Sequence, residues 1–199
     1  MKRKRKSTRR AGWTVLELSI AAVLASLVVG KAVFVLRSAS RTGGTQSTAL
    51  ALEDRARSVM DRIAVAIMGS DRGTLIPTLE GIHNNRMRYK FSLGLEDGEV
   101  VWSDPEEILF DEAGLDVVWT RDSAAANDVR VVWANEVGAL LEGEIDNGVD
   151  DNGNGLVDEQ GLSFELDGNS VVIRLSLQRQ VPGGPPVTET IESIVTCRN

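Results

Sequence analysis

The sequence predicts an α+β fold in which a long N-terminal helix packs on an antiparallel β-sheet domain. Three observations predict it. A mostly apolar run occupies residues 13–36, apolar residues then recur at three- and four-residue steps over 52–67, and from residue 87 onward they recur at every second position. A helical period followed by repeated strand periods places helix and sheet in separate parts of the chain, which is the α+β arrangement.

Residues 13–37 are expected to form a transmembrane helix. The apolar run would be about 36 Å long at 1.5 Å per residue, which is enough to cross a bilayer. Lys31 lies near its far end, where the ammonium group can reach the membrane interface. Glu17 lies about one turn into the run, where a carboxylate is costly unless it is paired. Glu17 is therefore a candidate functional residue.

Residues 38–69 are expected to continue this helix in amphipathic form. The segment 38–44, SASRTGG, is small, polar and glycine-bearing, which predicts a flexible or locally melted stretch. The helical period then resumes, and charged residues fall mostly between its apolar positions, which are Leu52, Ala56, Val59, Ile63 and Ile67. Gly69 is expected to end the helix.

Residues 70–199 are expected to form the β domain. Apolar and polar residues alternate over 87–95, and Glu96-Asp97-Gly98 offers a turn before Val100–Trp102, so this region predicts a β-hairpin. Asp167-Gly168-Asn169 predicts a second turn, and 181–186, rich in proline and glycine, predicts a loop. Further strands are expected at 116–120, 129–133, 162–166, 171–177 and 187–197.

The charge is unevenly distributed. The chain has 22 Lys and Arg against 29 Asp and Glu, a formal charge of −7. Seven of the positive residues lie within the first twelve, so without residues 1–12 the balance is 15 against 29, or −14. This acidic domain argues against nucleic acid as its partner. A basic tail directly before an apolar run is typical of retention on the cytoplasmic side of a membrane.

The N-terminus carries a processing motif. A basic leader, residues 1–12, ends in Gly12 and is followed by Trp13, Thr14-Val15-Leu16 and Glu17. This order resembles the cleavage site of type IV pilins and type II secretion pseudopilins, with Trp13 where the family usually has phenylalanine. The resemblance implies that a prepilin peptidase cleaves after Gly12 and methylates the new amine of Trp13. It also implies that Glu17 meets the amine of a neighbouring subunit.

The chemistry of the motif is consistent with that expectation. Gly12 has no side chain to obstruct a protease cleft. The new amine of Trp13 would be cationic near neutral pH, and Glu17 offers it an opposite charge in a low-dielectric helix bundle. The two groups are four residues apart, so a pair within one helix is also an option.

The resemblance implies a structural subunit and no enzyme. The expected location is the inner membrane, crossed once, with the C-terminal domain in the periplasm or on a surface filament. The expected partners are other pilin-like subunits, the prepilin peptidase and the membrane itself. Chain length, Glu17, the segment 52–72 and the terminal 197–199 resemble the J-type minor pseudopilin of type II secretion, and a minor pilin of a type IV pilus is the alternative.

A second interpretation treats the N-terminus as an export signal. Ser7-Thr8-Arg9-Arg10 resembles a twin-arginine signal, and Ser38-Ala39-Ser40 is a tolerable cleavage site. The chain would then be an exported calcium-binding protein, or one held by an uncleaved anchor. The apolar run is longer than the roughly 7 to 15 residues of a signal-peptide core.

The segment 144–161, EIDNGVDDNGNGLVDEQG, predicts a calcium loop. Oxygen ligands at alternate positions can face one centre, and Gly155 permits a sharp bend. Gly161 stands where an EF-hand has its glutamate, so we expect weak affinity, about 10⁻⁴ to 10⁻³ M. A metal-free turn is the alternative, and Asp146 is an additional candidate ligand. The predicted ligands are Asp150, Asn152, Asn154, the carbonyl of Leu156, Asp158 and Glu159.

The remaining reactive residues predict no catalytic site. His83 is expected in a polar loop, and Cys197 is expected to be a small packing residue. The acid pairs Glu106-Glu107 and Asp111-Glu112 are expected on a solvated face. Core packing is expected for three tryptophans, Trp102, Trp119 and Trp133.

Overall fold

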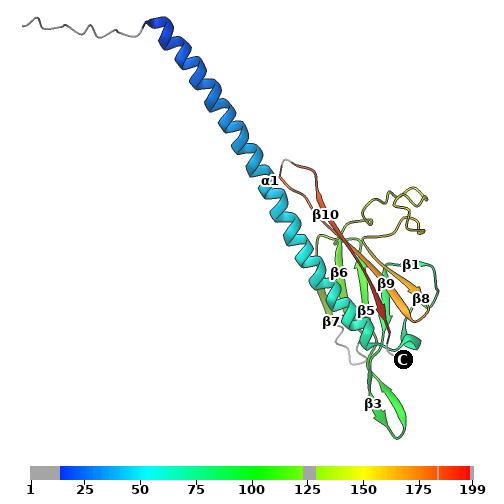
Figure 1. Cartoon of the computed structure of the whole chain (residues 1–199). Coiled ribbons are helices and arrows are strands. Elements are labelled where there is room, and N and C mark those ends of the chain that lie inside the picture. The colour runs from blue at the N-terminus through cyan, green and yellow to red at the C-terminus, as the bar shows by residue number, and fades with distance from the viewer. Residues whose placement is uncertain (1–13, 123–128, 183, 198–199) are drawn as a thin grey trace, which may run out of the picture. The chain divides into compact units, whose positions relative to one another are not determined.

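A computed structural model describes residues 14–122, 129–182 and 184–197 (Figure 1). The chain is α+β, as predicted: one long helix, α1 (Val15–Gly69), precedes a set of antiparallel strands. It divides into two units, Met1–Gly44 and Thr45–Asn199.

In the first unit, α1 is apolar around its whole circumference. Its side chains from Val15 to Ala39 are all exposed, and the segment is long and apolar enough to span a membrane. A helix of this kind is stable only when lipid or other helices cover it. The melted stretch expected at 38–44 is wrong, because these residues are helical. Each glycine costs a helix only about 1 kcal/mol, which flanking turns can offset.

In the second unit, the end of α1 is amphipathic, as predicted. The five apolar positions from Leu52 to Ile67 are buried, and Asp54, Arg57 and Arg62 are exposed. The helix ends at Gly69, also as predicted. A Cβ atom on Gly69 would lie 2.9 Å from the Phe91 ring, so only glycine lets this ring approach the helix end.

The strands form two four-stranded antiparallel sheets and one separate hairpin. A short 3₁₀ helix, η1 (Arg72–Thr74), leads into them. The first sheet has the order β1-β8-β9-β10, formed by β1 (His83–Asn84), β8 (Leu162–Asp167), β9 (Ser170–Arg179) and β10 (Val187–Thr196). The second has the order β2-β5-β6-β7, formed by β2 (Arg86–Tyr89), β5 (Glu106–Asp111), β6 (Asp116–Arg121) and β7 (Val129–Ala134). The hairpin pairs β3 (Ser92–Glu96) with β4 (Glu99–Trp102).

The hairpin at 92–102 confirms one prediction and corrects another. Its turn residues Asp97 and Gly98 both have positive φ, 52° and 87°, as a two-residue type I′ turn requires. The alternating run 87–95 is two strands, however. Tyr89 is buried in the second sheet, whereas Leu95 is exposed, because β2 pairs with β5 and β3 belongs to the separate hairpin.

One core joins the helix to both sheets. Ile63 on α1, Ile108 on β5 and Phe164 on β8 are completely buried in the same apolar cluster. The helix was predicted to lie across one sheet face. It packs instead against both sheets. The strands expected at 116–120, 129–133, 162–166, 171–177 and 187–197 are all present, and β5 was not predicted.

Candidate functional site

The described part of α1 begins with a capping box. The Thr14 backbone N–H donates to Glu17 Oε2 at 2.9 Å, and the Glu17 N–H donates to Thr14 Oγ1 at 3.3 Å. The Thr14 hydroxyl also donates to the same carboxylate at 3.1 Å. This reciprocal pairing of an N-cap threonine with a glutamate three residues on satisfies two free donors of the first helical turn. The carboxylate also lies at the positive end of the helix dipole.

Glu17 therefore has a local role that sequence reasoning missed. The pattern Thr-x-x-Glu is present in the sequence, but Glu17 is interpreted above only as a charge that pairs with an amine, of its own helix or of a neighbouring one. Gly12 and Trp13, the predicted processing residues, lie outside the described residues. A Gln at position 17 would keep the capping geometry and remove the charge, so capping and charge pairing can be separated by experiment.

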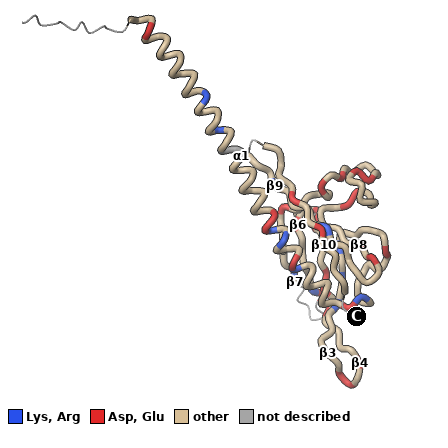
Figure 2. Tube along the Cα trace, viewed as in Figure 1, with Lys and Arg blue, Asp and Glu red and all other residues tan. Residues whose placement is uncertain are grey.

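The acidic loop 144–161 carries several Asp and Glu residues, which are red in Figure 2. Its backbone is held by the carboxylate of Asp150. The carboxylate oxygens accept backbone N–H groups of Gly153, Asn154 and Gly155, at 2.6, 3.2 and 2.8 Å. Asn152 Oδ1 in turn accepts the Asn154 N–H. Three of the predicted ligands, Asp150, Asn152 and Asn154, thus lie together in one chain of short-range hydrogen bonds.

The other two predicted side-chain ligands, Asp158 and Glu159, accept hydrogen bonds from other parts of the chain. Asp158 accepts the backbone N–H groups of Asn147 and Gly148 at 3.0 and 2.9 Å. Glu159 is completely buried, and it accepts from Asn154 Nδ2 and, at 3.2 Å, from Arg174 Nη1. Glu159 therefore ties the end of the loop to β9.

A second buried carboxylate, at the start of the loop, accepts hydrogen bonds from two later positions of the loop. Glu144 accepts the N–H groups of Asn152 and Asp158, both at 3.2 Å. Within the described ranges, no three His, Cys, Asp or Glu side chains converge as metal ligands. Asp150, Asp158 and Glu144 accept backbone donors and Glu159 accepts side-chain donors, and a cation would have to displace some of these. The carbonyl of Leu156 remains a predicted ligand.

No protein-family model, curated protein or solved structure matches the chain.

A cluster of hydrogen-bonded side chains surrounds one buried carboxylate between β2, β5 and β6. Glu106, which was expected on a solvated face, is buried and accepts from Tyr89 Oη at 3.1 Å and Trp119 Nε1 at 3.0 Å. Arg121 donates to its other oxygen from Nε at 3.0 Å and from Nη2 at 2.6 Å. The pKa of Tyr89 is raised well above its usual value. Burial is the larger cause, and the negative charge of Glu106 is the second.

This cluster lies beneath an apolar groove beside α1. The groove has a volume of about 610 Å³ and is lined by Val65 and Ala66 of the helix and by aromatic residues of the sheet side. Trp119 and Trp133 stack there with ring centroids 6.2 Å apart, and both pack against the core, as predicted. Trp102 is different: it is 37% exposed on the hairpin, so its predicted core role is wrong.

The remaining candidate residues lie in strands or directly beside them. His83 is in β1, paired with Glu165, and not in a loop. Cys197 is buried directly after β10, as predicted, and burial raises the pKa of its thiol. Asp111 is not simply solvated, because it forms an ion pair with Arg130 at 2.5 Å.

Proposed function

We propose that the chain is a pilin-like structural subunit, processed after Gly12 by a prepilin peptidase and assembled through its N-terminal helix. The observation that carries the proposal is α1 itself. Its first part is fully exposed and apolar, and its only acid, Glu17, stands at the first turn. Its last part is built into the core of an α+β domain.

This arrangement suits assembly. Lipid covers the apolar helix before assembly, and the helices of neighbouring subunits cover it afterwards. Both environments have a low dielectric, so a charge at position 17 favours a neighbour that supplies an amine. Removal of residues 1–12 creates that amine at Trp13. Docking of the amine on Glu17 would then set how far one helix is displaced along the next.

Within this class, we propose a minor subunit in the inner membrane, with its domain in the periplasm or on a surface filament. The J-type minor pseudopilin and a minor pilin of a type IV pilus both fit. The alternative is an exported protein held by an uncleaved anchor. The capping box would give Glu17 a role there too, so only cleavage after Gly12 and assembly into a filament distinguish the two hypotheses. We assign the chain no reaction.

Cell fractionation tests the proposal. Native cells are sheared, and the chain is quantified in the released filaments and in the membranes. We expect the chain with Gly12 intact to enter the filament fraction. A Gly12→Leu variant, whose side chain obstructs the cleavage site, should stay in the membranes. Equal release of both chains would contradict the proposal.

We also propose that the loop 144–161 binds calcium weakly, through the six ligands predicted above. At about ten times a Kd of 10⁻³ M, calcium adds about 1.4 kcal/mol of stability. For a chain of this size, that raises the Tm by roughly 3 to 6 °C. The Tm of the full chain in detergent, measured with and without calcium, checks this.

Matched variants locate the effect. Asp150→Ala combined with Asp158→Ala should abolish the calcium-dependent rise, whereas Asp167→Ala, an exposed acid outside the loop, should keep it. A Tm of the unmodified chain that does not respond to calcium would remove the site.

A further inference from the structure

The β3–β4 hairpin exposes apolar side chains that nothing in the described chain covers. Its strands pair only with each other among the described residues. An isolated two-stranded hairpin is marginally stable in water. This hairpin also leaves apolar side chains in solvent: Leu93 is 68% exposed, Leu95 is 74% exposed and Val100 is 43% exposed. Exposed apolar residues gathered on one element mark an interaction surface.

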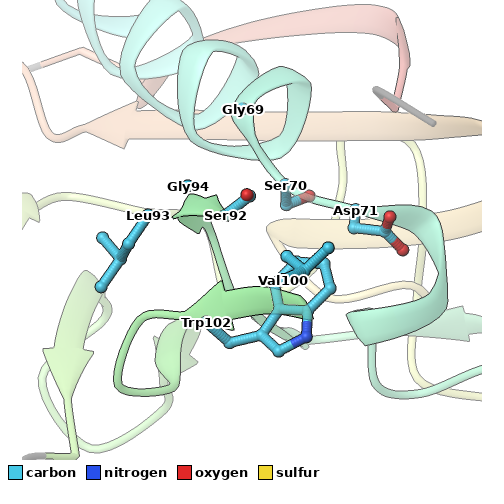
Figure 3. Close-up of a pocket in the computed structure, with 8 residues that line it drawn as sticks. All are labelled: Gly69, Ser70, Asp71, Ser92, Leu93, Gly94, Val100 and Trp102. Atoms are coloured by element: carbon cyan, nitrogen blue, oxygen red, sulfur yellow. The ribbon is translucent and has the colours of Figure 1, made fainter. Parts of the chain in front are cut away.

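Three apolar side chains of the hairpin share one face, which we call the hairpin face: Leu95, Val100 and Trp102. Leu95 is directly opposite Val100 in the register, and Trp102 follows Val100 by two residues on β4. Figure 3 shows Val100 and Trp102 beside Ser70 and Asp71, which follow the end of α1. These residues line a cavity of about 520 Å³. The cavity therefore has an apolar wall and a carboxylate at its edge.

The tip of the hairpin is acidic. Glu96 and Glu99 flank the turn and Asp97 lies in it, and no ion pair among the described residues includes them. By contrast with these acids, eight arginines of the domain form ion pairs with acids of the same domain. The hairpin thus offers unpaired negative charge beside an apolar face.

The charge of the domain argues against a second copy as the occupant. From Thr45 onward the sequence has 12 Lys and Arg against 28 Asp and Glu, a formal charge of −16. Two such domains repel each other, and each has little unpaired positive charge for the acidic tip of the other. A basic partner has the complementary potential.

We propose that the hairpin face docks a different protein, one whose surface presents Lys or Arg among apolar residues. The stem of such a side chain would lie along Val100 and Trp102 in the cavity, with its cation near Asp71 and over the Trp102 ring. The acidic tip would attract the basic surroundings. This interface goes beyond helix assembly and does not depend on cleavage after Gly12.

A photoreactive amino acid at position 100 of the full chain, in native cells, tests the proposal. We expect a covalent adduct with another protein, whose cross-linked peptide carries Lys or Arg next to apolar residues. Reversing the tip charges, with Glu96→Lys and Glu99→Lys, should lower the yield about tenfold or more, because like charges then face each other.

The control is Asp167→Lys with Ser170→Lys, which adds two lysines at another hairpin turn and changes the charge by +3, against +4 for the tip variant. These residues flank the two-residue turn between β8 and β9, just as Glu96 and Glu99 flank the turn between β3 and β4. The control should leave the yield unchanged, and the Tm of both variants shows that the domain is folded. An adduct between two copies of the chain, the absence of an adduct, or an equal yield in both variants would overturn the proposal.

Discussion

Glu17→Gln is expected to remove the chain from the assembled filament while leaving it in the membrane. Gln keeps the hydrogen bonds of the capping box, but it leaves the neighbouring amine unpaired in a low-dielectric bundle. Removing one partner of a buried charge pair costs about 3 kcal/mol or more, which corresponds to about a hundredfold loss of incorporation. Quantitative immunoblotting of sheared filaments and membranes measures this ratio.

Thr14→Ala is the matched control. It removes the side-chain half of the capping box, at a cost of about 1 kcal/mol, and leaves the carboxylate charged. Incorporation should fall by less than about tenfold. The reverse order, with Thr14→Ala strongly impaired and Glu17→Gln normal, would mean that Glu17 acts only as a helix cap.

Ile63→Ala should cost the domain a large part of its stability. Ile63 is completely buried in the core that α1 shares with both sheets. Deleting its outer carbons leaves a cavity and costs about 2 to 5 kcal/mol. The urea midpoint of the full chain in detergent, followed by tryptophan fluorescence, should fall by roughly 1 to 3 M.

Val65→Ala is the control for this second prediction. Val65 lies two residues along the same helix but is 64% exposed. Its truncation should change the free energy of unfolding by less than about 0.5 kcal/mol. Equal shifts for the two variants would contradict the packing of α1 described above.

The sequence predicted elements well where the pattern was local. The buried positions of α1 from Leu52 onward follow directly from their period, and the strands β6 to β10 were all expected from the sequence. The helical stretch 38–44 was not predicted, because glycine content is a weak guide when both flanks are helical. The division of 87–95 was also missed, because alternation cannot reveal that the chain leaves one sheet and starts a separate hairpin.

The buried acid at Glu106 was missed for a different reason. Glu106, Ile108 and Phe110 lie on the buried face of β5. Two adjacent glutamates, considered alone, predict a solvent-exposed position. The residues that satisfy Glu106 come from β2 and β6, and only strand pairing brings them there. The Thr14–Glu17 capping box was local and could have been found.

The N-terminal mass of the chain tests the central claim most directly. The protein is extracted from native membranes, and its N-terminal peptide is identified by mass spectrometry. The account predicts that the peptide begins at Trp13 and carries a methyl group on its amine. A chain that retains residues 1–12, or one that begins after Ser40, would contradict it.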